Sequence, residues 1–242
     1  LAPGTYRGRF TIDRPAAPED RAWLCGQAST ALDGGDVRRG VVLHLDGADH
    51  WTVQGLVVRE GLKGVMVDAS TDVALLGLRV HTIGDEGIHL RTGSTGARVV
   101  GNVVSDTGLR EPEFGEGLYV GSAHSNWCRY TGCEPDRSDG ALLADNLVYA
   151  TTAEPIDVKE GTTGGTIERN QLDGSAITGE VPDSWLALKG NAWTVRDNAG
   201  RSSPGDGFQV TRVLEGWGLR NVLESNTGTG VRGAVVVTPA PE

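Results

Sequence analysis

The chain has 242 residues and a formal net charge of −10, with 36 glycines and only 5% aromatic residues. This negative charge argues against a nucleic-acid partner, because phosphate binding needs a basic face. No apolar run approaches the length of a membrane-spanning segment, so no membrane partner is expected either.

The first residues, at positions 1–12, look like one coil of a repetitive fold that is already under way. We therefore expect a signal peptide and an end-capping segment to precede Leu1 in the gene product. No repeat is visible at positions 13–39, and that stretch is left loosely assigned. Cys25 lies within it, and we expect this residue to be buried or to pair with something outside the chain.

From residue 43 onward a short frame recurs: usually a small residue, three or four residues alternating between apolar and polar, then Gly, Ser or Thr. Its copies are LHLD at 43–46, GVMVDAS at 64–70, GIHLRTGS at 87–94, GLYVGS at 117–122, PIDVKEGT at 155–162, WLALKGN at 185–191 and GFQVTR at 207–212. A repeat interval in the twenties, stretched by insertions, predicts a solenoid.

Between these copies, β-branched and aliphatic residues come in short bursts broken by Gly, Asn, Asp, Ser and Thr, as at 73–80 and 97–108. This pattern favours short strands joined by tight turns, and no stretch has a sustained helical periodicity. Leucine-rich repeats would need regularly spaced leucines, which are absent. We predict an all-β chain with one domain at 1–242, a right-handed parallel β-helix of roughly eight coils with three parallel sheets.

Asparagine recurs near the second turn of successive coils. Such a residue tolerates a left-handed backbone at a bend and can bond to the same group in the next coil. We interpret the series as turn-forming residues and not as ligands: Asn102, Asn146, Asn170, Asn198 and Asn226.

The longest interruption of the frame is a polar loop insertion at 122–140. Cys128 and Cys133 lie close together in it, which predicts a loop-closing disulfide and hence a secreted protein, with two free thiols as the alternative. A zinc site is not expected, because only His124 lies nearby. Trp127 in the same loop is a candidate for substrate contact.

When the copies of the frame are aligned, Glu86, Glu116 and Glu154 fall in one column at the turn that enters each strand. Coils stack about 4.8 Å apart, and carboxylates this close either raise a pKa or recruit a cation. With Asp157 nearby in sequence, the four residues form a candidate Ca²⁺ site, because oxygen atoms are the ligands of that ion.

Two further columns accompany the acidic one. Lys159 and Lys189 are in register, with Arg91 two copies before Lys159, and His89 and Tyr119 occupy a column between acid and base. The sequence therefore predicts one face with an acidic, an aromatic or imidazole, and a basic strip. Ordinary solvated side chains remain the alternative for each single position.

These segments resemble coils of pectate-lyase-like right-handed β-helix proteins, which belong to the polysaccharide lyase superfamily. The resemblance runs over nearly the whole chain, including GDEGIHLRTGS, GEGLYVGS, EPIDVKEGTTGG and DSWLALKGN. It implies cleavage of a uronate polymer by β-elimination, in which Ca²⁺ neutralises the substrate carboxylate and a Lys or Arg removes the C5 proton. Glu154, Asp157 and Lys159 match this arrangement. The chain departs from it in lacking the Asp-Asp cluster and the Arg-bearing loop of several pectate lyases.

The resemblance and the columns together predict a secreted, monomeric polysaccharide lyase that acts on an acidic polysaccharide. Lys159 is the expected base, Arg91 or Lys189 the expected clamp for the substrate carboxylate, and Tyr119 or His89 the expected proton donor to the leaving oxygen.

A lysine base needs a lowered pKa, which neighbouring cations favour and carboxylates oppose unless a metal neutralises them. The lysine-base and metal hypotheses therefore depend on each other. Two other functions stay open. One is a glycoside hydrolase with Glu116 and Glu154 as paired carboxylates, whose separation would decide the stereochemical outcome. The other is a non-catalytic carbohydrate-binding module.

Overall fold

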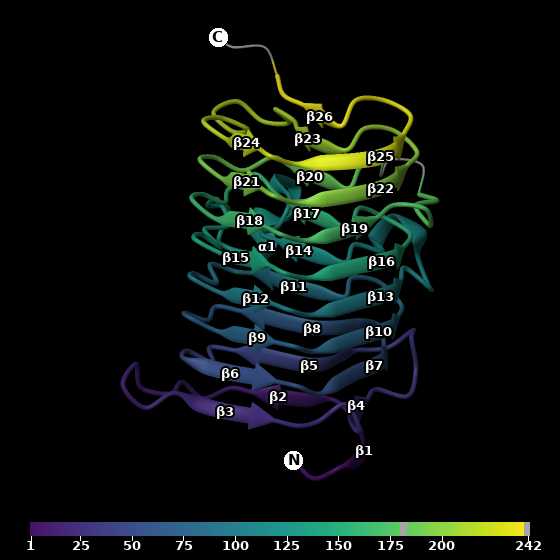
Figure 1. Ribbon diagram of the computed structural model, residues 1–242. Coiled ribbons are helices and arrows are strands. Elements are labelled where there is room, and N and C mark those ends of the chain that lie inside the picture. The colour runs from purple at the N-terminus through teal and green to yellow at the C-terminus, as the bar shows by residue number, and fades with distance from the viewer. Residues whose placement is uncertain (180–182, 240–242) are drawn as a thin grey trace.

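The chain winds through a stack of short strands, and the successive turns of the winding build three sheets that run from the N-terminal to the C-terminal end (Figure 1). The computed structural model describes residues 1–179 and 183–239. Neighbouring strands in all three sheets pair in parallel. The predicted parallel β-helix is therefore confirmed. No helix among the described residues is long and apolar enough to cross a membrane.

The first sheet contains nine strands: β1 (Gly4–Arg7), β4 (Thr30–Asp33), β7 (Val57–Gly61), β10 (Arg79–Ile83), β13 (Val103–Thr107), β16 (Leu147–Thr151), β19 (Gln171–Asp173), β22 (Ala199–Ser203) and β25 (Thr227–Val231). The second sheet also contains nine: β2 (Phe10–Ile12), β5 (Val41–Asp46), β8 (Lys63–Asp68), β11 (Ile88–Arg91), β14 (Leu118–Val120), β17 (Ile156–Val158), β20 (Leu186–Leu188), β23 (Phe208–Val210) and β26 (Val236–Val237).

The third sheet contains eight strands: β3 (Ala22–Cys25), β6 (Trp51–Gln54), β9 (Ala74–Leu76), β12 (Arg98–Val100), β15 (Leu142–Ala144), β18 (Thr166–Glu168), β21 (Thr194–Arg196) and β24 (Val222–Glu224). The stretch 13–39, which shows no repeat in the sequence, contributes β3 and β4 to the stack. Cys25 ends β3, where it is exposed, so the expectation of a buried thiol was wrong.

The core is a stack of aliphatic and aromatic side chains inside the winding. The predicted inward column of the second sheet is in register from strand to strand and is at most 1% exposed: Val65, Ile88, Leu118, Ile156, Leu186 and Phe208. Each such side chain contributes about 1.5–3 kcal/mol by leaving water. Because the side chains of a strand alternate between inward and outward, this column fixes which residues face outward.

One side chain of the core reaches across several coils. Trp185 is fully buried, and its ring centroid lies 5.4 Å from that of Phe208. A Cβ atom added to Gly200, Gly207 or Gly228 would lie within 2.6 Å of the indole of Trp185. These three positions therefore need glycine to leave room for the indole.

The recurring asparagines form a ladder through the stack. Each side-chain oxygen, from Asn146 onward, accepts hydrogen bonds of 2.9 to 3.1 Å from the backbone N–H and the Nδ2 of the asparagine one coil before. The expected bond to the same group in the next coil is confirmed. The left-handed backbone instead falls on the preceding residue, as at Asp145 and Arg169, with φ of 57° and 54°. This placement leaves the asparagine side chain buried inside the turn.

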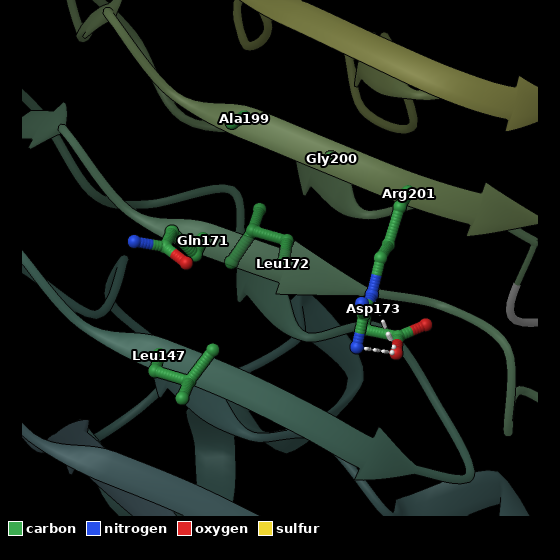
Figure 2. Close-up of a pocket in the computed structure, with 7 residues that line it drawn as sticks. All are labelled: Leu147, Gln171, Leu172, Asp173, Ala199, Gly200 and Arg201. Atoms are coloured by element: carbon green, nitrogen blue, oxygen red, sulfur yellow. Dashed lines mark hydrogen bonds and ion pairs between the residues drawn. The ribbon is translucent and has the colours of Figure 1, made fainter.

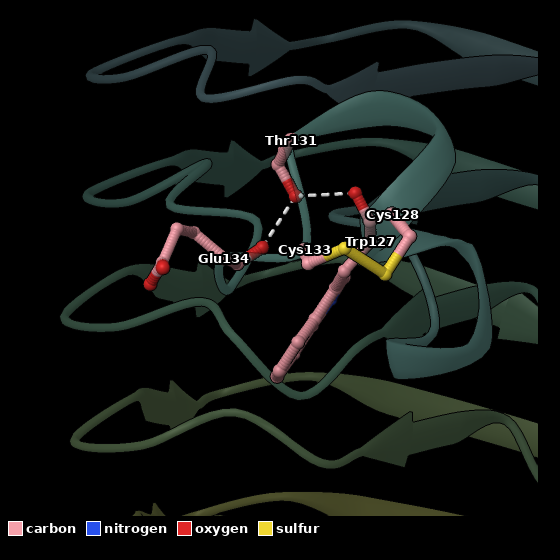
Figure 3. The surroundings of a disulfide bond; sticks show 5 residues. All are labelled: Trp127, Cys128, Thr131, Cys133 and Glu134. Carbon is pink, nitrogen blue, oxygen red and sulfur yellow. Dashed lines mark hydrogen bonds between the residues drawn. A yellow bond between two sulfur atoms is a disulfide. The ribbon is translucent and has the colours of Figure 1, made fainter.

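The insertion at 122–140 forms a small structured unit that contains η2 (His124–Asn126) and α1 (Trp127–Tyr130). Figure 3 shows the disulfide between Cys128 and Cys133, which confirms the predicted pairing. Thr131 follows α1, and its hydroxyl donates to the Trp127 carbonyl at 3.1 Å. The disulfide and this bond close the chain on itself just after the helix.

A buried aspartate attaches the insertion to the β-helix. Asp136 is fully buried and accepts hydrogen bonds of 2.7 to 3.0 Å from the backbone N–H groups of Thr92 and Gly93 and from the hydroxyls of Ser122 and Ser138. Four donors satisfy one carboxylate, and these bonds fix the insertion against the turn that follows β11.

Candidate functional site

A cleft of about 670 Å³ lies over the second sheet at β11, β14 and β17. Outward side chains of these strands and of the residues just after them form its floor, including His89, Tyr119 and Lys159. Its walls come from the two loops that interrupt the winding here. One is the loop 109–116, which contains η1 (Pro112–Phe114), and the other is the insertion 122–140.

The acidic column is present beside this floor. The N–H of Gly87 donates to the carbonyl of Glu116 at 2.9 Å, and the N–H of Gly117 donates to that of Glu154 at 3.2 Å. These bonds place Glu86, Glu116 and Glu154 at the same position in consecutive coils, where each is less than 9% exposed.

Three carboxylates converge, namely Glu116, Glu154 and Asp157, which offer oxygen atoms within 4.8 Å of one another. Burial and the negative charges of Glu86 and Asp157 raise the pKa of Glu116 well above its usual range. Burial and the charge of Asp157 raise the pKa of Glu154 to about 7. Oε2 of Glu116 is buried and has no hydrogen-bond partner among the described residues. The cluster therefore favours an added positive charge, either a proton or a metal cation.

The fourth predicted carboxylate has other partners. Glu86 forms an ion pair with Lys63, and its Oε1 lies 3.6 Å from Nδ1 of His89. Burial alone would raise the pKa of Glu86, but His89 and Lys63 hold it at about 2. The negative charge of Glu86 is thus already paired within the protein, and Glu86 does not belong to the cluster of Glu116, Glu154 and Asp157.

The basic column meets the carboxylate group at Asp157. Nζ of Lys159 lies 2.6 Å from one oxygen of this fully buried carboxylate, and Nζ of Lys189 lies 2.7 Å from the other. Burial would raise the pKa of Asp157, but the two ammonium groups lower it. Burial would also lower the pKa of Lys159, but Asp157 raises it, so Lys159 is an ammonium group in this arrangement.

Arg91 is held in a separate network. Its guanidinium donates to both oxygens of Asp68 at 2.7 and 3.0 Å, and its Cζ lies 4.1 Å from the ring centroid of Tyr130. His44 contacts the same carboxylate at 2.8 Å. Burial would raise the pKa of Asp68, but His44 and Arg91 lower it. The sequence does not predict this contact, because Asp68 lies one coil away from His44.

His89, Tyr119 and Lys159 form a stack on the floor of the cleft. The ring centroids of His89 and Tyr119 are 4.1 Å apart, and Nζ of Lys159 lies 5.2 Å from the centroid of Tyr119. Nε2 of His89 donates to the carbonyl of Gly121 at 2.8 Å, which requires the proton on that nitrogen. Burial raises the pKa of Tyr119 well above its usual range, so its hydroxyl is protonated.

The cleft also contains residues that the repeat could not reveal: Lys63, Arg110, Phe114, Arg129 and Tyr130. All but Lys63 lie in the two loops, outside the repeating frame. In the sequence, the indication that these loops form walls was their position on either side of the frame copy at 117–122. Trp127 does not line the cleft, because its Nε1 donates to the carbonyl of Ser122 and its ring packs against Trp217.

A second groove, of about 380 Å³, lies on the first sheet (Figure 2). Its lining is largely apolar, and its charged residues Arg201 and Asp173 pair with each other at 2.8 Å. Because this groove lacks a convergent set of titratable groups, the cleft over the second sheet is the better candidate site.

Solved structures resemble this chain, whereas no protein-family model and no curated protein matches it. An alginate lyase from Paenibacillus sp. str. FPU-7 superposes with a TM-score of 0.89 and is 30% identical, over 98% of this chain and 86% of that chain. Pectate lyase Pel9A superposes with a TM-score of 0.66 at 12% identity, over 100% and 72% of the two chains. A variant of the PL6 family alginate lyase AlyGC gives 0.58 and 16%, over 98% and 37%. The two weaker likenesses show a shared fold.

Proposed function

The chain belongs to the polysaccharide lyases of the right-handed parallel β-helix fold, and on this premise we propose that it cleaves alginate by β-elimination. The observation that carries the proposal is the pair of Tyr119 and Lys159 on the floor of the cleft, with Nζ 5.2 Å from the ring centroid. The name of the 30% identical relative supports alginate as the uronate polymer.

The cleft is suited to a polyanion although the chain as a whole is acidic. Five cationic side chains line it, namely Lys63, Arg91, Arg110, Arg129 and Lys159, together with the four acidic residues Asp85, Glu86, Glu113 and Glu116. The raised pKa of Glu116 favours its neutral form, so positive charge exceeds negative charge in the cleft. A local positive field of this kind attracts a negatively charged ligand to a protein whose net charge would repel it. Arg91 keeps its place through Asp68, so it is pre-organised to bind a substrate carboxylate.

In the proposed reaction, Nζ of Lys159 in its neutral form takes the C5 proton of a uronate unit. The electron pair of the C5–H bond forms the C4–C5 double bond, and the C4–O4 bond breaks with its electron pair on O4. The hydroxyl of Tyr119 gives its proton to O4, and proton transfer from Lys159 to Tyr119 restores both groups. Tyr119 is preferred over His89 as donor, because Nε2 of His89 is held by the Gly121 carbonyl.

Lys159 is protonated while it contacts Asp157, so its activation depends on the acidic cluster. Glu116, Glu154 and Asp157 would hold Ca²⁺, since they present three hard oxygen ligands, one of them otherwise unpartnered. When bound, the ion would neutralise the cluster and a substrate carboxylate. Asp157 would then attract Lys159 less strongly, and Lys159 would lose its proton more readily. Glu86 would stay with Lys63.

The setting of the enzyme is part of the proposal. The disulfide between Cys128 and Cys133 supports a location outside the cytosol, because disulfides persist in oxidising compartments. The described residues of a single chain form the floor and both walls of the cleft, which supports a monomeric enzyme.

The test is to incubate the purified protein with alginate, pectate, glucuronan and glycosaminoglycans, with Ca²⁺ or with a chelator, and to record ultraviolet absorbance. We expect an absorbing product from alginate, since β-elimination creates a double bond. Lys159→Ala should lower kcat by about 10²–10⁴-fold. Arg169→Ala, which alters an exposed ion pair outside the cleft, serves as the control.

Three outcomes would count against the proposal. New reducing ends without absorbance would indicate a hydrolase, and binding without cleavage would indicate a carbohydrate-binding module. Full activity of Lys159→Ala would show that this lysine is not the base. Equal activity with and without chelator would remove Ca²⁺ from the reaction.

A further inference from the structure

We propose that Asp136, in the insertion 122–140, is a positioning residue for substrate binding, which holds Arg91 and Tyr130 against each other from outside the cleft. Asp136 is fully buried and does not line the cleft itself. The proposal rests on the proposed function, because it concerns the way in which Arg91 meets a substrate carboxylate.

The first contact of Asp136 is with the turn that directly follows Arg91. Thr92 and Gly93 both have a left-handed backbone in this turn, with φ of 58° and 74°. This conformation is unfavourable for a β-branched residue such as threonine. The two successive backbone N–H groups donate to the two oxygens of Asp136 at 3.0 and 2.9 Å. Successive N–H groups of a turn form a concave site for an anion, so the buried carboxylate stabilises this backbone.

The same turn is tied to the guanidinium of Arg91. The hydroxyl of Thr92 donates to Oδ1 of Asp68 at 2.9 Å. That oxygen also accepts from Nε of Arg91 at 2.7 Å, while Oδ2 of Asp68 accepts from Nη2 at 3.0 Å. Thr92 therefore links Asp136 to the carboxylate that orients Arg91.

A second route runs from Asp136 through the insertion to the other side of Arg91. The hydroxyl of Ser122 donates to Oδ2 of Asp136 at 2.7 Å, and the carbonyl of Ser122 accepts from Nε1 of Trp127 at 2.9 Å. Trp127 begins α1 and Tyr130 ends it. The ring centroid of Tyr130 lies 4.1 Å from Cζ of Arg91. One buried carboxylate thus fixes both the turn after Arg91 and the helix whose tyrosine covers the guanidinium.

The consequence concerns the affinity for substrate. Arg91 lines the cleft, where Asp68 holds the edge of its guanidinium and Tyr130 covers its face. A side chain that is already ordered loses little freedom when it binds a carboxylate, so binding is tighter. The proposed function assigns Arg91 to binding and not to proton transfer. Loss of its position should therefore raise KM much more than it lowers kcat.

The main experiment measures KM and kcat of Asp136→Asn in the full chain on alginate, from the ultraviolet absorbance of the product. Asparagine has the same shape, but its Nδ2 would face one of the two backbone N–H groups, and neither of these can become an acceptor. We expect KM to rise about tenfold and kcat to change less than about threefold. Asp139→Asn is the matched control, because Asp139 lies in the same insertion and accepts the N–H of Thr163 at 2.7 Å. Its KM should stay within about twofold of the wild type.

The outcomes separate this inference from the proposed function. An unchanged KM in Asp136→Asn, or an equal rise in Asp139→Asn, would refute the positioning role while the wild type still cleaves alginate. A wild type that does not cleave alginate would refute the proposed function and this inference together.

A second experiment asks whether Asp136 acts through Arg91. Arg91→Lys keeps a positive charge beside Asp68 but cannot form the planar contact with two bonds. In this background Asp136→Asn should change KM less than about twofold, because residues that act through one group are not additive. A full tenfold rise in this background would show that Asp136 acts elsewhere, and the inference would be wrong.

Circular dichroism and the melting temperature show whether each variant is folded. If Asp136→Asn does not fold, Thr92→Val decides the question, because it removes only the hydroxyl that links the turn to Asp68. We expect KM of Thr92→Val to rise about threefold with kcat unchanged. A wild-type KM in this folded variant would contradict the route from Asp136 to Arg91.

Discussion

Two polar columns run through this molecule, and they differ in how well their groups are satisfied. The asparagine ladder repeats a neutral amide that donates to one coil and accepts from another, so each added coil completes the bonds of the previous one. The glutamate column repeats a carboxylate, and each added copy brings a like charge into a buried place. Two of its members, Glu116 and Glu154, have raised pKa values as a result.

The contrast shows what repetition does in a stacked fold. Repeating a self-complementary group at the interstrand spacing stabilises the fold, whereas repeating a group of like charge destabilises it. Buried like charges that persist without full compensation mark a place where stability has been given up for function. We therefore expect changes in the ladder to lower stability and leave activity intact, and changes in the glutamate column to do the reverse.

The largest effect on stability should come from breaking the ladder at its middle. Asn170→Ala removes the partner of two Asn146 donors and of the Leu143 carbonyl, all of them buried. Unsatisfied buried groups cost about 1–3 kcal/mol each, so the free energy of unfolding should fall by about 4 kcal/mol. Urea denaturation measures this change. Exposed Gln171→Ala is the control and should stay within about 0.5 kcal/mol. A loss below about 1 kcal/mol would show that the ladder is not a source of stability.

The next effect is a dependence of stability on pH through Glu154. Its folded pKa of about 7 lies above the ordinary value of 4.5, so the folded state holds the proton more tightly. The stabilisation is complete below pH 4.5 and is lost as pH rises through 7. Between pH 5 and pH 8 in chelator, the wild type should lose about 2–3 kcal/mol more than Glu154→Gln does. Parallel pH profiles of the two proteins would contradict the assigned pKa.

A smaller effect is expected at Glu116. Glu116→Gln replaces a buried carboxyl by a neutral group of the same shape, so at pH 8 the free energy of unfolding should rise by about 1 kcal/mol. Activity should fall in the same variant. Ca²⁺ should raise the melting temperature of the wild type more than that of the variant, because an ion stabilises only the state that binds it. An identical Ca²⁺ response in both proteins would exclude Glu116 as a ligand.

The smallest effect should come from an exposed ion pair that belongs to neither column. Arg169 pairs with Asp145 at 2.8 Å, and both side chains are nearly half exposed. Arg169 also pairs with Glu168 at 2.5 Å, and Glu168 keeps Arg196 as a second partner when Arg169 is removed. Solvent screens such a pair, so Arg169→Ala should change neither the unfolding transition nor the rate of cleavage measurably. A clear loss of stability in this variant would mean that the two columns are not where polar contacts matter most.

The sequence was a good guide wherever the chain repeats. The intervals between Val65, Ile88 and Leu118 predict strands in register, because this alignment places all three residues inside. The same alignment correctly puts Glu86, Glu116 and Glu154 in one column. It could not show that Lys63 would pair with Glu86, since long side chains reach across coils in ways that spacing does not specify.

The walls of the cleft were beyond the reach of the repeat. Asp136 holds the insertion against Thr92 and Gly93 through hydrogen bonds between segments more than 40 residues apart. No periodicity in the sequence predicts these bonds. For the same reason Trp127 looked like a contact residue, whereas Tyr130, three positions later, is the aromatic residue of the insertion that lines the cleft. The role of a non-repeating segment can be predicted only when its tertiary contacts are known.

The buried indole of Trp185 has a consequence for how the molecule comes apart. A solenoid joins only neighbouring coils, so its ends can fray one turn at a time. Trp185 fills the space that Gly200, Gly207 and Gly228 leave open, and peeling away any of these turns exposes the same ring. The C-terminal turns should therefore detach together, as one cooperative block. Because the indole would enter water in that single event, its fluorescence would report the opening of this end before the rest of the stack unfolds.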